Sequence, residues 1–290
     1  MKISVIGKRK IWYAISAVIL LAGLVSLLVQ GMNLGIDFVG GNRLNLAFEQ
    51  QVEIADLRAT LTENDLGDSK IQLLDDGSYL LKTRELDQAA QDELIGKIEA
   101  KHGTVTIVQS GLVGPSVGAE LKKNAVISLT LAVLLMIAYI TYRFEMHFAI
   151  AGVLALFHDI FVVVALFSIF QMEIDSTFIA ALLTIYGYSI NDKIVVFDRI
   201  RENMGRVKKD QLSSLVDNSI AQSFTRSMNT SISTLILLLA LFIFGGQTTR
   251  VFALAMIIGV VAGTYSSLCI ASPIWYEFKM KIKGNRVDAK

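Results

Sequence analysis

Residues Phe148–Phe170 read FAIAGVLALFHDIFVVVALFSIF, and only His158 and Asp159 interrupt this apolar stretch with ionisable side chains. An α-helix rises about 1.5 Å per residue, so a helix of this length crosses the roughly 30 Å hydrocarbon core of a bilayer. The stretch therefore predicts a membrane-spanning helix that carries two ionisable side chains near its centre.

The composition of the whole chain agrees with this prediction. Of its 290 residues, 53% are hydrophobic and 18% are charged, and the mean hydropathy is +0.54. Soluble domains carry about 25% charged residues, so the composition excludes a water-soluble enzyme. A net charge of +1 gives no reason to expect nucleic acid as a partner. The single cysteine, Cys269, excludes a disulfide within the chain.

Six apolar segments are long enough to span a bilayer, and about 90 polar residues separate the first from the second. We expect the cytoplasmic amino terminus and an uncleaved first span in residues 1–30, and an extramembrane domain in 31–123. Spans two to six and a cytoplasmic loop at 198–223 occupy 124–276, and a tail occupies 277–290. The six predicted spans are Ile11–Gln30, Asn124–Tyr142, Phe148–Phe170, Ser176–Phe197, Phe224–Phe244 and Val251–Tyr276.

The distribution of basic residues predicts the orientation, because short cytoplasmic loops carry an excess of Lys and Arg. The short loops predicted to lie on the other side, around Glu173–Asp175 and Gly245–Arg250, contain only one basic residue, Arg250. Both termini are therefore predicted to be cytoplasmic, with the extramembrane domain on the opposite side. The basic residues in the amino terminus, the 198–223 loop and the tail are Lys2, Lys8, Arg9, Lys10, Arg199, Arg201, Arg206, Lys208, Lys209, Lys279, Lys281, Lys283, Arg286 and Lys290.

The extramembrane domain has a strand and helix order of its own. Leu44, Leu46 and Phe48 alternate with polar or small residues, as in a half-buried strand. Helical patterns at 52–66 and 86–102 flank two short strands joined by a turn at Asp75–Ser78, and a last strand begins near Val105. The order β-α-β-β-α-β predicts a ferredoxin-like α+β domain, so the fold class is an α-helical membrane protein with this domain between helices 1 and 2.

Two ionisable residues in the predicted fourth and fifth spans are candidates for proton coupling. Asp192 and Arg226 lie about 7 Å and 12 Å from the middle of their spans, at 1.5 Å per residue. Asn191 and Tyr188 lie beside Asp192, and both charges belong to polar stripes that we expect to face each other. One interpretation is a structural ion pair that joins two helices. The other is a proton-responsive pair whose protonation moves the helices.

Three further ionisable residues in the spans leave alternatives open. His158 and Asp159 are either a mutually satisfied polar cluster or a proton relay. Lys193 follows Asp192, about 100° around the helix, and we expect its side chain to extend toward the cytoplasmic interface in a structural role.

The remaining patterns indicate packing and the absence of an enzymatic site. Ala255, Gly259, Gly263 and Ser267 form a stripe of small residues, which predicts close helix packing. An apolar face beside Lys208 and Lys209 predicts a separate helix on the cytoplasmic membrane surface. The sequence shows no phosphate-binding loop, no nucleophile–base pair and no metal-ligand spacing, so we expect neither an enzyme nor a cofactor or metal other than coupling protons. The apolar face consists of Leu212, Leu215, Val216, Ser219 and Ile220.

Several motifs, in the right order along the chain, resemble the SecD/SecF family of the bacterial Sec export machinery, and in particular its SecF branch. This family belongs to the resistance–nodulation–division superfamily. Two motifs lie at the junctions between membrane and extramembrane parts, and three lie in later spans. The junction motifs contain Gly35, Asp37, Gly40, Gly41, Gly114, Pro115, Gly118 and Glu120; the others are Phe157–Asp159, Gly187–Asp192 continuing to Val195–Asn203, and Gly263–Ser267.

The resemblance implies a role and partners. Family members use the proton-motive force to promote protein export through the SecYEG channel. They lie in the bilayer of the bacterial inner membrane as heterodimers with SecD, and they contact the unfolded polypeptide during translocation. The family places a proton-sensitive aspartate and an arginine at the positions of Asp192 and Arg226. Lys193 and Asn42 depart from the usual family residues. Two alternatives remain: a proton-coupled small-molecule exporter of the same superfamily, and a scaffold that uses no energy.

Overall fold

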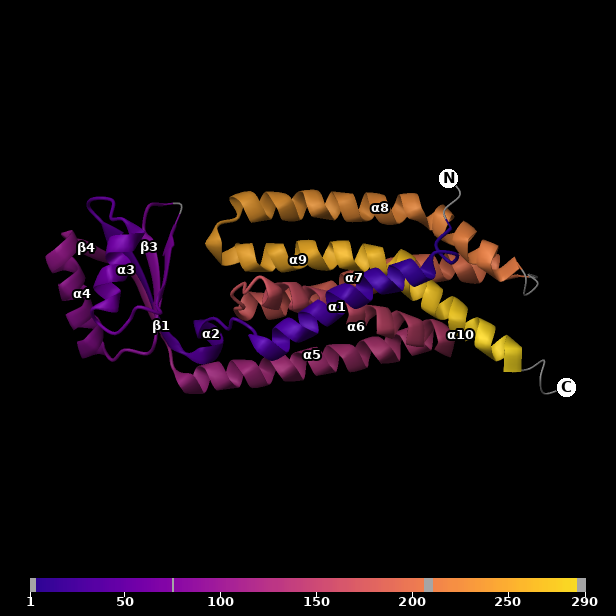
Figure 1. Ribbon diagram of the computed structural model, residues 1–290, viewed down its shortest axis with the longest axis horizontal. Helices are drawn as coiled ribbons and strands as arrows, with labels where there is room; N and C mark the ends of the chain where they lie inside the picture. The colour runs from indigo at the N-terminus through magenta and orange to yellow at the C-terminus, as the bar shows by residue number, and fades with distance from the viewer. Residues whose placement is uncertain (1–3, 75, 206–210, 286–290) are drawn as a thin grey trace. The chain divides into compact units, whose positions relative to one another are not determined.

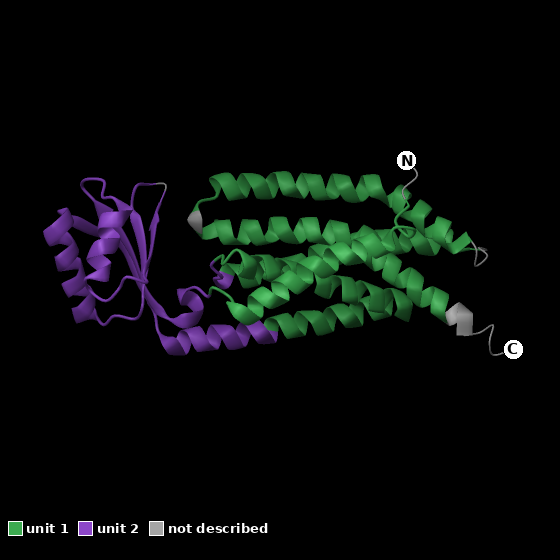
Figure 2. Ribbon diagram, viewed as in Figure 1, with its two compact units in different colours: residues 1–33, 128–172, 177–290 green, residues 34–127, 173–176 purple. Residues whose placement is uncertain are grey.

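The computed structural model describes residues 4–74, 76–205 and 211–285. The chain folds as two compact units, coloured separately in Figure 2. The helical unit comprises Met1–Asn33, Ser128–Met172 and Thr177–Lys290, and the sheet unit comprises Leu34–Ile127 and Glu173–Ser176. Residues named above that lie outside the described ranges are Lys2, Asp75, Arg206, Lys208, Lys209, Arg286 and Lys290.

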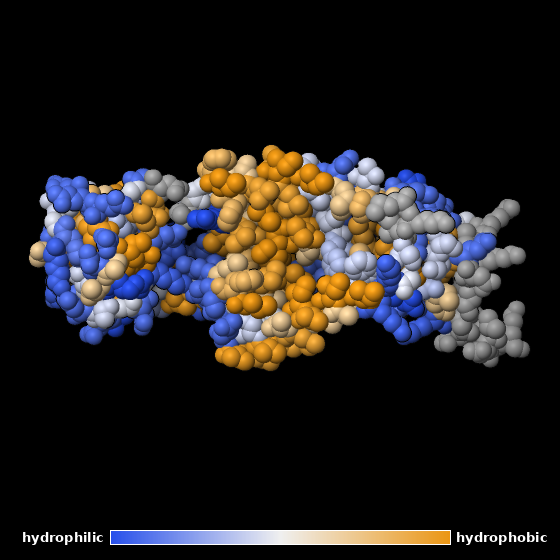
Figure 3. Space-filling view, turned by 45° about the horizontal axis from the view of Figure 1, so that its top comes forward, coloured by the Kyte–Doolittle hydropathy of each residue, from blue (hydrophilic) through white to orange (hydrophobic). Residues whose placement is uncertain are grey.

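Six helices among the described residues are long and apolar enough to cross a membrane, as the sequence predicted. The last span is composite, because a π-helical turn, Ser267–Ala271, separates two helices. Figure 1 shows these helices, and in Figure 3 hydrophobic residues form a broad band over the helical unit. The bounds are α1 Arg9–Val29, α5 Pro115–Arg143, α6 Met146–Ile169, α7 Ser176–Asn203, α8 Leu212–Phe244, α9 Gln247–Ser266 and α10 Ser272–Asn285.

Aromatic side chains from three helices pack together in the core of the helical unit. Phe148 of α6 stacks on Trp275 of α10, with ring centroids 4.7 Å apart, and its ring lies 5.1 Å from that of Phe197 of α7. All three side chains are buried. Burial of such large apolar surfaces, together with aromatic pairing, stabilises the contacts among α6, α7 and α10.

The prediction of a separate helix on the membrane surface is wrong. Its residues form the first turns of α8, which runs without interruption from Leu212 to Phe244. The apolar face packs into the core instead of lying on a membrane, since Val216 and Ile220 are fully buried. Asp217 Oδ1 also accepts the backbone N–H groups of Val5 and Ile6, both at 2.9 Å, so this part of α8 binds the chain's amino-terminal segment.

The sheet unit confirms the predicted order of elements. Its four strands are antiparallel to their neighbours in the order β2-β3-β1-β4, so β3 lies between β1 and β2. This is the split βαβ arrangement of a ferredoxin-like domain. The elements are α2 Ile36–Val39, β1 Gly41–Phe48, α3 Ile54–Thr62, β2 Lys70–Leu73, β3 Tyr79–Thr83, α4 Gln88–His102 and β4 Val105–Val113.

The two faces of this sheet differ because side chains alternate along a strand. One face packs against α3 and α4 through the fully buried residues Leu44, Leu46, Leu57, Leu61, Leu81 and Ile98. The other face carries partly exposed polar residues, among them Arg43, Asn45 and Lys82. Lys70 of β2 lies directly opposite Lys82 of β3 on this polar face.

Candidate functional site

A buried polar cluster joins α6, α7, α9 and α1 inside the helical unit. The Asp159 carboxylate is fully buried and accepts hydrogen bonds at both oxygens. His158 Nδ1 lies 2.9 Å from Oδ1, and Lys193 Nζ lies 2.6 Å from Oδ2. Ser189 and Ser266 donate their hydroxyls to the same Oδ2. A buried carboxylate is tolerated only when it is paired in this way.

Lys193 does not extend toward the membrane interface, so that prediction is wrong. Its side chain is fully buried. Its ammonium has three donors and finds three acceptors, which are Asp159, Ser189 at 2.6 Å and Ser266 at 3.0 Å. The cluster reaches α1 because His158 Nε2 lies 2.9 Å from Ser16 Oγ, which in turn lies 3.2 Å from the Tyr265 hydroxyl. The polar groups of the cluster therefore satisfy one another, and the proton relay stays a prediction.

Asp192 lies in a different environment, although it precedes Lys193 in the chain. The residue is 7% exposed and faces α8, where Ser227 donates its hydroxyl to Oδ1 at 2.5 Å. Its second oxygen, Oδ2, is buried and has no hydrogen-bond partner among the described residues. The Ser267 hydroxyl also lies close to this carboxylate, but it donates to the Gly263 carbonyl at 2.7 Å. A buried acceptor without a partner is rare and costs free energy, so this oxygen calls for an explanation.

The predicted pair of Asp192 and Arg226 is not formed. Among the described residues, no carboxylate lies within 4.0 Å of the Arg226 guanidinium, and Arg226 is exposed on the outside of this chain. Successive residues of a helix differ by about 100° in direction. Ser227 therefore faces Asp192, and its neighbour Arg226 faces away from α7.

Exposed polar residues occur on both α7 and α8. Arg226 is one of them, and Asn191 and Thr184 on α7 are exposed as well. Tyr188 is half-buried, and its hydroxyl donates to Ser231 of α8 at 3.4 Å. We call these exposed residues the polar outer face; they are Thr184 and Asn191 of α7 and Gln222, Arg226, Asn229 and Ser233 of α8.

The residues that bind Asp192 and Lys193 were not predicted from the sequence, although a signal for some of them was present. Serines at every fourth position of α8 lie on one face of the helix, and all of them are buried. Ser227 belongs to this row and stands next to the charged residue on which the prediction rested. The row consists of Ser219, Ser223, Ser227 and Ser231.

The small-residue stripe lies where α9 meets α7. A methyl group on Gly259 would lie 2.4 Å from Ile185 Cδ1, and one on Gly263 would lie 3.1 Å from Ser189 Oγ. Ala255 and Ser267 are fully buried on the same stripe. Small residues at these positions let the two helices approach closely.

The glycine-rich junction motifs have a steric explanation within the sheet unit. A Cβ on Gly41, whose φ is +142°, would lie 2.2 Å from the carbonyl oxygen of Thr83. A Cβ on Gly118 of α5 would lie 2.8 Å from the carbonyl oxygen of Phe38. The remaining motif residues lie in the same region: Gly35 precedes α2, Asp37 lies within it, Gly40 has φ +84°, Gly114 and Pro115 stand at the start of α5, and Glu120 is exposed.

Comparisons with known proteins agree with this architecture. Residues 95–281 match the family described as "Protein export membrane protein SecD/SecF, C-terminal". Residues 25–52 match the SecD/SecF GG motif. Protein translocase subunit SecF of Sebaldella termitidis is 40% identical over 282 residues, covering 95% of this chain and 92% of the relative. Protein translocase subunit SecF of Acidaminococcus fermentans is 40% identical over 290 residues, covering 97% of this chain and 99% of the relative.

A solved structure gives the same result. The crystal structure of SecDF, a translocon-associated membrane protein from Thermus thermophilus, superposes with a TM-score of 0.85 at 34% identity. The match covers 96% of this chain but only 39% of the SecDF chain. This chain therefore spans about two fifths of that protein. On these matches, and on the six helices among its described residues that are long and apolar enough to cross a membrane, the chain is a multi-pass membrane protein that belongs to the SecD/SecF family.

Proposed function

We propose that this chain is a proton-coupled subunit of the bacterial protein-export machinery, in which Asp192 takes up and releases the coupling proton. It works as a heterodimer with SecD beside the SecYEG channel, in the inner membrane, with both termini in the cytoplasm. It promotes the export of unfolded polypeptide without hydrolysing a substrate, and it needs no cofactor other than protons.

The observation that carries this proposal is that Oδ2 of Asp192 has no hydrogen-bond partner in the part of the chain that the structure describes. The charged carboxylate accepts only one hydrogen bond from the described residues, from Ser227. A proton on this carboxylate would convert an acceptor into a donor and would remove a charge from the interior of the bundle. The two protonation states therefore favour different contacts between α7 and α8, which is what a ligand must do to shift a conformational equilibrium.

The proton gradient supplies enough free energy for such a shift. One charge that crosses the membrane potential releases about 2.3 kcal/mol per 100 mV. Since about 1.4 kcal/mol changes an equilibrium tenfold, one proton shifts two conformers by a factor of about 50.

The polar outer face supports SecD as the partner. An exposed guanidinium and amides at membrane depth are costly against lipid, and such groups normally face other protein or water. In the SecDF relative, a single longer chain includes the part that matches this one. A separate SecD subunit would cover the polar outer face, with an acceptor opposite Arg226.

The decisive experiment replaces Asp192 and measures gradient-dependent export in inverted membrane vesicles, with SecD co-purification as the assay of assembly. We expect Asp192→Asn to assemble and to lose the gradient-dependent part of export. Asp198→Asn is the matched control, because Asp198 lies on the same helix in ion pairs with Arg143 and Arg201 at its polar end. Parental export in Asp192→Asn would leave a passive scaffold as the better description.

A further inference from the structure

The four residues before and at the start of α7 belong to the sheet unit, not to the helical unit. Three contacts hold them there. Leu34 forms a parallel bridge with Ile174, and the Gly35 N–H donates to the Ile174 carbonyl at 2.8 Å. These two interactions with Ile174 are the first contact. The second joins Asp37 to Ser176, and the third joins Glu173 to Lys82 and Lys70. Residues 173–176 therefore connect the sheet unit directly to α7, the least apolar of the six described spans.

Asp37 caps the amino terminus of α7. Its Oδ2 accepts both the backbone N–H of Ser176, at 2.9 Å, and the Ser176 hydroxyl, at 2.8 Å. The first N–H groups of a helix lack partners within the helix, and a carboxylate there also interacts favourably with the helix dipole. Arg43 of β1 lies 3.5 Å from the other oxygen of Asp37. Ser176, the first residue of α7, is therefore bound to Asp37 of α2, and Asp37 is in turn paired with Arg43 of β1.

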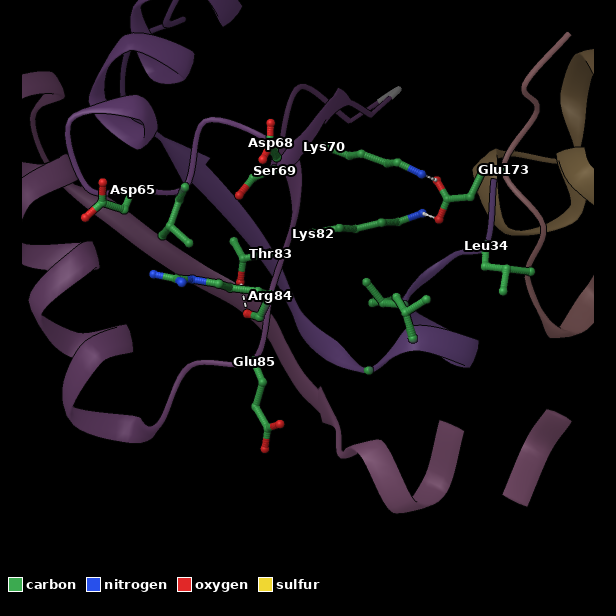
Figure 4. Close-up of a pocket in the computed structure, with 14 residues that line it drawn as sticks. Leu34, Asp65, Asp68, Ser69, Lys70, Lys82, Thr83, Arg84, Glu85 and Glu173 are labelled. Atoms are coloured by element: carbon green, nitrogen blue, oxygen red, sulfur yellow. Dashed lines mark hydrogen bonds and ion pairs between the residues drawn. The ribbon is translucent and has the colours of Figure 1, made fainter. Parts of the chain in front are cut away.

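Glu173 binds two lysines on the polar face of the sheet. Lys82 of β3 lies 2.7 Å from its Oε1 and Lys70 of β2 lies 3.5 Å from its Oε2. Figure 4 shows both lysines extending from neighbouring strands toward this carboxylate. The three residues line a cavity of about 490 Å³. Like charges directly opposite each other on adjacent strands repel, so Glu173 offsets a repulsion that the strand pairing creates.

This ion pair is better shielded from water than an ordinary surface pair. The Lys82 side chain is 13% exposed and that of Glu173 is 21% exposed. Gly35 permits the approach, since a Cβ at that position would lie 2.7 Å from Glu173 Oε1. Partial burial reduces solvent screening, so the contact resists displacement more than an exposed pair does.

Asp192 lies on the helix that begins at this point. α7 is continuous from Ser176 to Asn203, and Asp192 is about 24 Å along it at 1.5 Å per residue. A continuous helix moves as a rigid element, so a displacement at Asp192 reaches Ser176 with little loss.

From these contacts we infer that Asp37 and Glu173 are positioning residues that transmit movement of α7 to the β-sheet. The inference rests on the proposed function, because it assumes that the protonation of Asp192 moves α7. It adds the route by which that movement leaves the membrane: the cap at Ser176 and the Glu173 contact with Lys82 and Lys70.

The test uses the full chain co-assembled with SecD and compares Glu173→Gln and Asp37→Asn with the parent. Coupling energies between sites commonly correspond to factors of 5 to 150, so we expect each variant to lower gradient-dependent export about fivefold or more. SecD co-purification should not change. Glu85→Gln is the matched control. Glu85 lines the same cavity, but it is exposed and its side chain forms no hydrogen bond or ion pair with another described residue. It should export like the parent.

Hydrogen exchange provides a readout that a merely structural role would not move. In the parent, Asp192→Asn should change the exchange rates of amides in β2 and β3. The same substitution should leave these rates unchanged when Glu173→Gln is also present. The charge exchange Lys82→Glu with Glu173→Lys should restore both export and this response.

The outcomes separate the two proposals. If Asp192→Asn exports like the parent, the proposed function fails. If Asp192→Asn abolishes gradient-dependent export but Glu173→Gln and Asp37→Asn do not reduce it, only the coupling role of Asp37 and Glu173 is overturned. Loss of SecD assembly in both variants, or a failure of the charge exchange to restore export in an assembled complex, would also overturn it.

Discussion

The Lys193 ammonium lies 2.6 Å from a carboxylate oxygen of Asp159, and both side chains are completely buried between α6 and α7. The adjacent residue, Asp192, points toward α8 and leaves one oxygen without a partner among the described residues. Two consecutive residues of one helix thus have opposite properties. Lys193 completes a satisfied cluster that holds helices together, whereas Asp192 keeps one acceptor unpaired within the described ranges.

The Asp159–Lys193 pair leads to a first prediction. Asp159→Asn leaves a buried ammonium without its countercharge, and breaking a buried pair in this way costs about 3–5 kcal/mol. We expect a markedly lower thermal unfolding temperature for the purified chain in detergent. Asp198→Asn, which removes a partly exposed carboxylate, should cost less than about 1 kcal/mol.

A double substitution distinguishes loss of the pair from a general defect at this site. Adding Lys193→Met to Asp159→Asn removes the unpaired charge, so the double variant should be more stable than Asp159→Asn alone. Strictly additive losses would show that the two side chains do not interact.

Local sequence patterns predicted most of the fold but not the partners within the site. The six spans and the ferredoxin-like order were predictable, because apolar length and strand alternation are local patterns, as at Phe148–Phe170 and Leu44–Phe48. The partners of Asp192 and Lys193 were not predicted, because a rotation of about 100° decides whether Arg226 or Ser227 faces α7. Depth in the membrane places residues at one level, but it does not orient them.

The second prediction concerns the glycine of the junction motif that begins β1. Gly41→Ala places a methyl group against the Thr83 carbonyl at a φ of +142°, and such strain costs at least about 1–3 kcal/mol. We expect faster hydrogen exchange in β1 and β3 of the full chain. Gly111→Ala in β4 is the control, because among the described residues no atom other than those of its chain neighbours lies within 4 Å of the position that its methyl group would take. Equal effects of the two substitutions would argue against the steric role of Gly41.

A third prediction concerns pH and the turn that precedes β3. The Asp76 carboxylate accepts the N–H and the hydroxyl of Ser78, at 2.9 Å and 2.6 Å, and these bonds lower the pKa of Asp76 below its ordinary value of 3.8. Because the pKa of Asp76 is lower in the folded than in the unfolded state, its ionised carboxylate stabilises the turn at pH values above the unfolded pKa. This contribution is lost as pH falls below 3.8 and through the folded value. An NMR titration of the carboxyl carbon should give a lower pKa in the parent than in Ser78→Ala; identical values would contradict the prediction.

The last prediction tests the contact between α7 and α9. Gly259→Ala places a methyl group 2.4 Å from two atoms of Ile185, so the helices must separate or Ile185 must change its rotamer. Overpacking of this kind costs about 1–3 kcal/mol. Gly187→Ala lies on α7 itself, and among the described residues no atom beyond its own stretch of helix comes within 4 Å of the new methyl group, so it should instead gain up to about 1 kcal/mol from helix propensity. Thermal unfolding of the purified chain measures both. Because the three nearest atoms all belong to Ile185, the double variant Gly259→Ala with Ile185→Ala should lose less stability than the sum of the two single losses. A double variant that is less stable by the full sum of the two single losses would place the cost of Gly259→Ala elsewhere.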